Sequence, residues 1–175
     1  MSDTTENDVS RPRFTYITDF GGIAPADAEA LRAFWKREGA FNDDKQVDER
    51  LPQVVMHATT ADGEVAGVCT ALAMTHQRVG QPLYYWRCFV GKQWRSSQLV
   101  GLLLKKSCRV LEEHAAAHDF PCIGVLLELE NARFKERGRA PVWANPRFVY
   151  IGRSERKLDL RVLYFSGAKL KPPRG

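Results

Sequence analysis

Basic and hydroxyl side chains gather in one stretch of the sequence, residues 92–109, directly after an apolar run. This stretch holds five Lys or Arg residues and no Asp or Glu. Lys92 and Arg95 stand just before Ser96 and Ser97, either of which suits the N-cap of a long helix. The first backbone N–H groups of a helix are unpaired and lie at the positive end of its dipole, so they can bind a phosphate. The stretch is a candidate anion site, although an ordinary cap followed by a solvated basic helix face accounts for the same residues.

The distribution of charge along the chain also points to an anionic partner. Residues 1–64 contain seven Lys or Arg against 13 Asp or Glu, whereas residues 65–175 contain 19 against eight. Such a split is typical of a protein with a basic face that meets a phosphate-bearing cofactor, a nucleic acid or an acidic protein. Nucleic acid is the weakest of these candidates, because the basic residues are spread over several elements and no helix-turn-helix, zinc or RNA-recognition motif is present.

The apolar pattern predicts the elements that would position this stretch. Strands are expected at 14–20, 54–60, 64–74, 83–90, 123–129, 147–151 and 158–165, and helices at 25–38, from Ser96 or Ser97 to 118, and at 131–137. The pair Asp62-Gly63 predicts a hairpin, and the segment 41–52 reads as a loop or a short exposed helix. A strand–helix–strand unit places its two strands parallel. We therefore expect an α/β fold with a mixed, mostly antiparallel central sheet and helices on both faces.

Composition favours one soluble domain. The chain has 175 residues, of which 44% are hydrophobic and 27% charged, as in ordinary globular proteins. We expect a domain at 13–168, a disordered leader at 1–12 and a basic tail at 169–175. No apolar run approaches the roughly 20 residues that cross a bilayer, so no membrane span is expected. The four cysteines lack metal-ligand spacing, which favours buried free thiols, no metal site and a cytoplasmic location.

The element order and the turn after Val90 resemble the GNAT superfamily of N-acetyltransferases. In that family a strand ending in Val leads through a turn to Arg/Gln-x-x-Gly-x-Gly/Ala, which opens a Leu-rich helix. Here Arg95 follows Val90 by five residues, three leucines follow at 102–104, and Gln98 and Val100 occupy the two small-residue positions. The resemblance covers residues 13–168. It implies an acyltransferase that uses acetyl-CoA or another acyl-CoA, with the pyrophosphate held by backbone N–H groups of the turn.

The resemblance also implies which residues bind the cofactor. They belong to the turn, to the start of the long helix and to the segment after the strand at 123–129, where the pantetheine arm lies beside a splayed strand. The residues are Val90, Lys92, Arg95, Ser96, Ser97, Gln98, Leu99, Val100, Asn131 and Phe134. A backbone N–H at or beside Val90 would polarise the thioester carbonyl.

Acyl transfer to an amine needs a base, because the amine arrives protonated. Glu128 and Glu130 end the strand expected beside the thioester and share one strand face by the period of two. Either is a candidate base, and His76 is a second candidate. The alternative for the two carboxylates is that they face solvent or pair with Arg133 and Arg137.

The acid that returns a proton to the leaving thiolate is harder to assign. The family commonly places a tyrosine where this chain has Phe134, so either Tyr150, Tyr164 or a water serves instead, or the thiolate leaves unaided. Tyr84, Tyr85 and Trp86 alternate across both faces of one strand and are expected in the core, with one of them a candidate wall of the acceptor pocket.

Other functions remain open at this stage. A GNAT-like module could bind acyl-CoA without catalysis, or an acidic acyl-carrier protein could replace acyl-CoA as the donor by docking on the basic half. The acceptor, expected to be a small-molecule or protein amine, is not specified, and a homodimer is compatible with the sequence.

Overall fold

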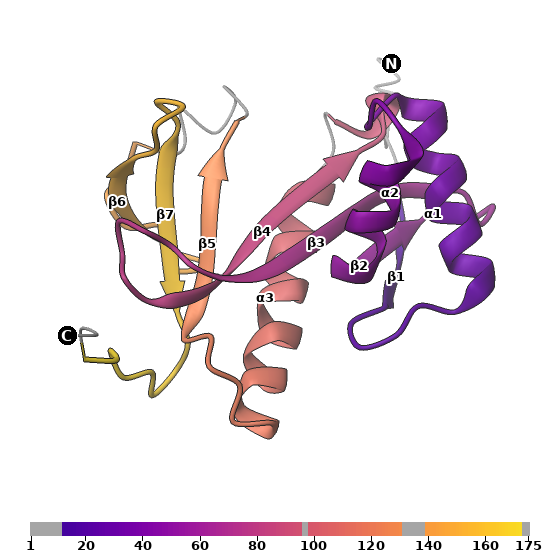
Figure 1. Ribbon diagram of the computed structural model, residues 1–175. Coiled ribbons are helices and arrows are strands. Elements are labelled where there is room, and N and C mark those ends of the chain that lie inside the picture. Colours follow the sequence, from indigo (N-terminus) through magenta and orange to yellow (C-terminus); the bar gives the residue numbers. More distant parts are fainter. Residues whose placement is uncertain (1–11, 96–97, 131–138, 173–175) are drawn as a thin grey trace, which may run out of the picture.

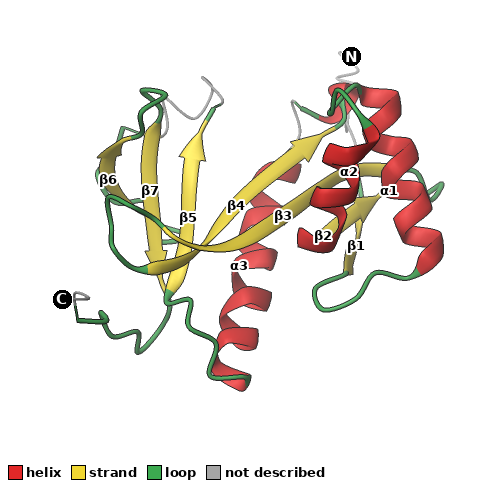
Figure 2. Ribbon diagram, in the orientation of Figure 1, coloured by secondary structure: helices red, strands yellow, loops and turns green. Residues whose placement is uncertain are grey.

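Residues 12–95, 98–130 and 139–172 are described by the computed structural model, and they form one sheet with helices packed on it (Figures 1 and 2). The strands are β1 (Thr15–Thr18), β2 (Val54–Thr59), β3 (Val65–Thr75), β4 (Pro82–Val90), β5 (Gly124–Leu129), β6 (Val149–Arg153) and β7 (Asp159–Tyr164). The α-helices are α1 (Pro25–Glu38), α2 (Asp44–Arg50) and α3 (Leu99–Ala117), and short 3-10 turns follow at Leu51–Gln53 and Lys92–Trp94.

The sheet is mixed and mostly antiparallel, as the sequence predicts. Its seven strands lie in the order β1-β2-β3-β4-β5-β7-β6, and β4 and β5 form its parallel pair. Helix α3 connects these two strands across one face, while α1 and α2 cover the other face (Figure 1). The helix expected at 131–137 and the two serines expected at the cap of α3 lie outside the described residues.

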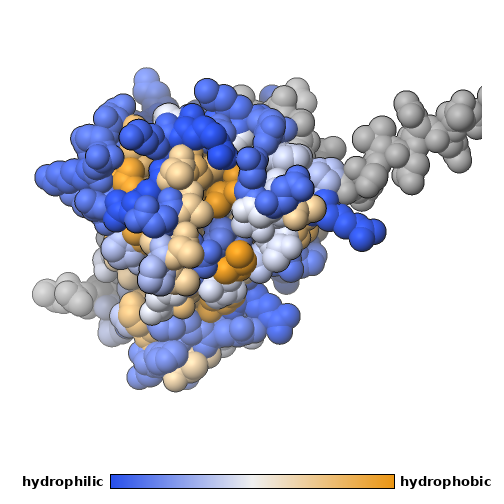
Figure 3. All heavy atoms as spheres, turned by 90° about the vertical axis from the view of Figure 1, so that its right-hand side faces the viewer, coloured by the Kyte–Doolittle hydropathy of each residue, from blue (hydrophilic) through white to orange (hydrophobic). Residues whose placement is uncertain are grey.

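Helix α1 begins and ends where its residue types indicate. Pro25 stands in the first turn, and Gly39 ends the helix in the left-handed conformation with φ of 65°, which glycine adopts without strain. Leu31, Phe34 and Trp35 are buried against β2 and β3. The outer surface on this side of the molecule is mostly hydrophilic with scattered apolar patches (Figure 3).

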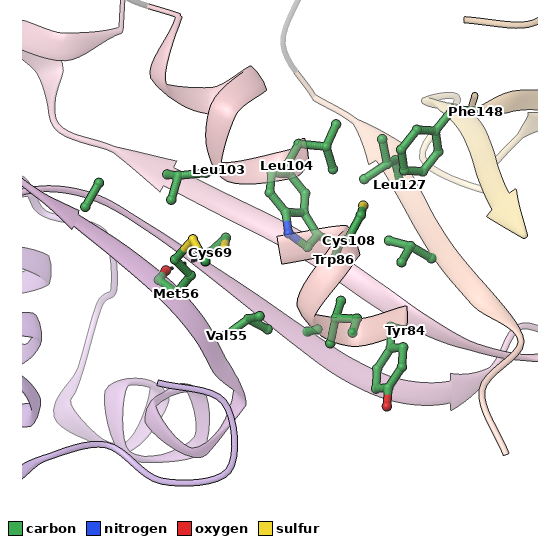
Figure 4. Packing of buried hydrophobic residues seen from close by; sticks show 14 of the residues in the cluster. Val55, Met56, Cys69, Tyr84, Trp86, Leu103, Leu104, Cys108, Leu127 and Phe148 are labelled. Carbon is green, nitrogen blue, oxygen red and sulfur yellow. Dashed lines mark hydrogen bonds between the residues drawn. The ribbon is translucent and has the colours of Figure 1, made fainter. Parts of the chain in front are cut away.

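Helix α3 is fixed on the opposite face by a dense apolar cluster around Trp86 (Figure 4). Leu99, Leu103 and Leu111 are fully buried beneath it. The indole N–H of Trp86 donates to the Ser107 hydroxyl over 2.8 Å, which joins β4 to the middle of the helix. The four cysteines are free, three of them buried, which confirms the expectation of free thiols. Within the described part of the chain, no helix is both long and apolar enough to cross a membrane.

Strands β4 and β5 pair only over their first halves. The parallel register runs from Tyr84 opposite Val125 to Trp86 opposite Leu127, after which the two strands diverge (Figure 1). On its other side β5 stays paired with β7 up to Leu129. The carboxyl end of β5 therefore turns away from β4 with β7, and the sheet opens at this point.

Candidate functional site

A cavity of about 340 Å³ lies where β4 and β5 separate. Trp86, Leu104 and Leu127 line it on the face that carries α3, and Figure 4 shows these three side chains near one another. Trp35 and Phe41 line it on the face that carries α1 and α2. Because its walls come from both faces, the cavity passes between the two strands and joins the two sides of the sheet.

The end of β4 offers backbone groups to this opening. The Gly91 N–H donates to the Ala66 carbonyl of β3 over 2.9 Å. Consecutive residues of a strand direct their N–H groups to opposite sides, so the N–H of Val90 points away from β3, toward the side where β5 has left the ladder. This orientation fits the predicted contact between Val90 and a thioester carbonyl, which stays a prediction.

In the turn between β4 and α3, both basic residues are exposed, and Arg95 contacts the end of β4 with its side chain while Lys92 contributes its backbone. The Arg95 Nε donates to the Val90 carbonyl over 3.2 Å, and its guanidinium lies 5.8 Å from the centre of the Phe89 ring. The backbone N–H of Lys92 donates to the Glu38 carboxylate over 3.0 Å, so one donor of the turn already has an anionic partner. At the helix start, the N–H of Leu102 donates to the Gln98 carbonyl over 3.1 Å, so Gln98 already accepts a bond of the first helical turn.

The structure brings together only part of the predicted site. Val100, Glu128 and Glu130 line the cavity, and so do Tyr85 and Trp86. The other described cofactor candidates do not line it and belong to the strand end, the turn and the helix start: Val90, Lys92, Arg95, Gln98 and Leu99. Four candidates lie outside the described residues: Ser96, Ser97, Asn131 and Phe134.

Glu128 is the carboxylate best placed for chemistry. Its Oε2 accepts a hydrogen bond of 2.6 Å from the Tyr85 hydroxyl and lies 3.3 Å from Arg156, and only 9% of its side chain is exposed. Burial by itself would raise the pKa of Glu128. The hydrogen bonds from Ser154 and Tyr85 and the charges of Arg156 and His76 outweigh burial and hold this pKa below its ordinary value.

Glu130 lies nearer to solvent. Its side chain is 67% exposed, and its Oε1 lies 2.7 Å from the Arg156 guanidinium. Both carboxylates thus share Arg156 as their partner, whereas the sequence suggested Arg133 and Arg137, which lie outside the described residues. Glu128 is buried at the opening, so it is the stronger candidate for the base.

Tyr150 is not brought to the opening. It lies on β6, and β7 stands between that strand and β5. The guanidinium of Arg161 lies 5.8 Å from the centre of its ring, and Tyr150 does not line the cavity. Tyr164, on β7, is exposed and does not line the cavity either.

Three basic residues at the opening were missed by sequence reasoning. Arg87, on β4, and Arg50, at the end of α2, line the cavity, and Arg156 binds both carboxylates. The sequence does contain an indication that Arg87 is unusual, because this charged residue interrupts the otherwise aromatic and apolar run LYYWRCFV. The other two stand in polar segments, where a basic residue carries no distinguishing pattern.

A second, more open depression of about 730 Å³ adjoins the first through Glu128, which lines both. His76, the other candidate base, lines this depression together with Arg78, Arg153 and Arg156. His76 therefore faces Glu128 from the loop between β3 and β4, at the side of the opening.

Several solved structures share this architecture. No protein-family model matches the chain, and no curated protein matches it in sequence. The N-acyl amino acid synthase FeeM from uncultured soil microbes is 11% identical with a TM-score of 0.57, over 89% of this chain and 92% of that one. A GNAT-family acetyltransferase from Staphylococcus aureus is 14% identical with a TM-score of 0.55, over 88% of this chain and all of that one.

A third structure was determined with a ligand. Arabidopsis thaliana NAA60, in complex with a bisubstrate analogue, is 14% identical with a TM-score of 0.52, over 88% of this chain and all of that one. The agreement over nearly the whole length of each chain, together with the parting of β4 and β5, settles the architecture. The chain has the fold of the GNAT superfamily.

Proposed function

We propose that the protein is an acyltransferase that moves an acetyl or longer acyl group from acyl-CoA to an amine by direct attack. The observation that carries this proposal is the cavity between β4 and β5, which joins the two faces of the sheet and has Glu128 at its wall. A pantetheine arm entering from the side of α3 would present its thioester to an acceptor on the side of α1 and α2. The fold shared with NAA60, which was solved in complex with a bisubstrate analogue, supports a reaction in which donor and acceptor are bound at the same time.

In the proposed reaction the amine nitrogen attacks the thioester carbonyl and forms the C–N bond. The C–S bond breaks, the thiolate leaves, and the proton lost by the amine passes to Glu128, directly or through a water. Tyr85 orients this base: burial first, and then its hydrogen bond to Glu128, raise the pKa of Tyr85 to about 12, so the hydroxyl remains a donor at neutral pH. The leaving thiolate takes its proton from water, because neither Tyr150 nor Tyr164 lines the cavity.

Thiol release from acyl-CoA in the presence of an amine panel tests this proposal. We expect Glu128→Gln to lower kcat by about 10²–10⁴-fold, the range of a positioned general base. Glu113→Gln is a matched control, because Glu113 is an exposed carboxylate of α3 paired with Arg109. Equal rates in the two variants would exclude Glu128 as the base, and no thiol release with any amine would count against acyl transfer from acyl-CoA.

An acylated carrier protein is a second candidate for the acyl donor, and it is tested separately. Glu38 accepts the N–H of Lys92, so the turn offers one backbone donor fewer to a pyrophosphate. An acyl-carrier protein presents the same pantetheine arm on a single phosphate, and an acidic one would be attracted to a chain whose residues 65–175 carry a net charge of +11. Transfer from acylated carrier protein without transfer from acyl-CoA would favour this donor.

A further inference from the structure

Two guanidinium groups line the side of the cavity that faces α1 and α2. Arg50 stands at the end of α2 and Arg87 in the middle of β4, and both are half-buried. Each lies over an aromatic ring: the Cζ of Arg50 is 5.2 Å from the centre of the Phe41 ring, and that of Arg87 is 5.2 Å from the centre of the Tyr85 ring. The two positive charges are close enough for Arg87 to lower the pKa of Arg50 by repulsion.

These charges lack a direct carboxylate partner. Among the described residues, neither arginine has a carboxylate oxygen within 4.0 Å, and Arg87 donates instead to the neutral amide oxygen of Gln53. Glu130 attracts both arginines from farther away, but its carboxylate is held by Arg156. Burying a charge is unfavourable unless an opposite charge or hydrogen bonds compensate it. This wall of the cavity is therefore short of negative charge.

The pKa values of both arginines follow from the same surroundings. Burial first, and then the charge of Arg87, lower the pKa of Arg50 to about 10, and burial lowers the pKa of Arg87. Both groups stay protonated at neutral pH. A bound anion would reverse these shifts, since an opposite charge favours the charged form.

Two hydrogen-bonding atoms of this wall are buried, one on Thr70 and one on Arg87 itself. The Thr70 side chain stands opposite Arg87 in the register of β3 and β4, lines the same cavity and is only 3% exposed. Within the described residues, neither its hydroxyl nor the Arg87 Nε has a hydrogen-bond partner. Buried polar groups are almost always hydrogen-bonded, so these two atoms favour the binding of a polar group at this wall.

The distance from this cluster to the base is short. Arg87 lies over the ring of Tyr85, and the hydroxyl of the same tyrosine donates to Glu128 over 2.6 Å. Cation and carboxylate are therefore separated by about one tyrosine side chain on one face of the sheet. The aromatic rings of Trp35, Phe41 and Phe89 also line the cavity. A small molecule with an anionic group and an amine a few bonds apart would reach both ends.

We propose that Arg50, Arg87 and Thr70 form a carboxylate-binding subsite, and that the acceptor is a small amine that carries a carboxylate and an apolar side chain. A planar guanidinium holds a carboxylate through two parallel hydrogen bonds, and Thr70 adds a third donor. The carboxylate fixes the molecule, and its amine then lies toward Glu128 and the thioester. This subsite deepens the acyl transfer proposed above and rests on it for its catalytic meaning.

The test compares amino acids with the amines that lack only the carboxylate. Phenylalanine is paired with phenethylamine and leucine with isoamylamine, and the rest of the standard amino acids are screened in the same way. Binding to the free protein is measured by calorimetry or NMR titration, and acyl transfer by thiol release. We expect at least one amino acid to bind, and to be acylated, about tenfold or more better than its amine, as the loss of a charge-assisted hydrogen bond would give.

Substitutions within the subsite test whether its residues cause the preference for the carboxylate. Arg87→Gln and Thr70→Val should reduce the preference for the carboxylate toward one, while Arg109→Gln, on the exposed face of α3, should leave it unchanged. Arg87→Lys retains the charge but loses the planar fork, so an intermediate preference is expected even if the glutamine variant fails to fold.

The two proposals fail in different ways. Equal binding and equal rates for every amino acid and its amine, or an unchanged preference in the folded Arg87 variants, would overturn the subsite while acyl transfer stands. Selective binding of an amino acid with no transfer from acyl-CoA or carrier protein would retain the subsite and overturn the acyltransferase.

Discussion

Removing the Tyr85 hydroxyl should raise the pKa of Glu128. The carboxylate is 9% exposed and accepts a 2.6 Å hydrogen bond from this hydroxyl, so water replaces it poorly in Tyr85→Phe. A hydrogen bond to a charged group contributes about 1.5–3 kcal/mol, of which Ser154 and Arg156 can recover part. With about 1.4 kcal/mol for each pKa unit, we expect a rise of about one unit.

The same change has a consequence for stability. The pKa of Glu128 is lowered in the folded protein, so its ionised form stabilises the fold above the unfolded pKa, and this contribution is lost as the pH falls through the folded value. Tyr85→Phe brings the folded pKa closer to the unfolded one. The variant should therefore be less stable than the wild type at neutral pH, and the difference should shrink on acidification.

Carbon-13 NMR titration of labelled glutamate carboxyl groups measures the pKa, and urea denaturation at several pH values measures the stability. Tyr164→Phe is the control, because Tyr164 is exposed on β7 and does not line the cavity. A Glu128 pKa that stays constant or falls in Tyr85→Phe would refute the role given to this hydrogen bond. If Glu128 is the base, the acid limb of the kcat/KM profile should move upward by the same amount.

Three further substitutions test the packing that positions the site. Ser107→Ala removes the acceptor of the buried Trp86 indole and should lower the free energy of unfolding by about 1–3 kcal/mol in urea denaturation. Gly124→Ala would place a Cβ 2.2 Å from the Leu163 carbonyl oxygen, so β5 must shift against β7 and we expect a loss of about 1–3 kcal/mol in thermal or urea unfolding. Gly101→Ala meets nothing within 4 Å inside α3 and should stabilise the protein by about 0.5–1 kcal/mol; destabilisation there would show that the helix start is packed more tightly than described.

Most of the described elements could be predicted because each of them carries local signals. Pro25 and Gly39 bound α1, and Asp62-Gly63 marks the turn between β2 and β3, both of which the structure confirms. Hydrophobic period and turn chemistry are properties of neighbouring residues, so they can be interpreted without knowing the fold. The parallel pair β4 and β5 followed from the long helix that connects them.

The partners within the site could not be predicted in the same way. Tyr85 and Glu128 meet because the parallel register places Tyr85 opposite Leu126 and leaves Glu128 one step beyond the last paired residues. Registers between strands that are 40 residues apart depend on the whole core, not on local pattern. Arg156 reaches Glu128 from the turn between β6 and β7 for a similar reason.

The order of the strands also explains why one candidate acid, Tyr150, lies away from the cavity. Sequence alone does not say that β7 inserts between β5 and β6, and this insertion places Tyr150 at the far edge of the sheet. Arg50 stands in a segment that was expected to be a loop or a short helix; it ends α2, whose Val47 packs with α1, β2 and β3, and in this position it lines the cavity.

Calorimetric titration with acetyl-CoA and longer acyl-CoAs tests the central claim most directly. The wild type should bind in the micromolar range, and Arg95→Glu, which places a negative charge at the turn before α3, should bind at least about tenfold more weakly. Arg109→Glu makes the same change of charge at an exposed site farther along the helix and should bind like the wild type. Equally weaker binding in both variants would mean that acyl-CoA responds to the net charge of the protein and not to the turn. No binding of any acyl-CoA by the folded wild type would contradict acyl-CoA as the donor.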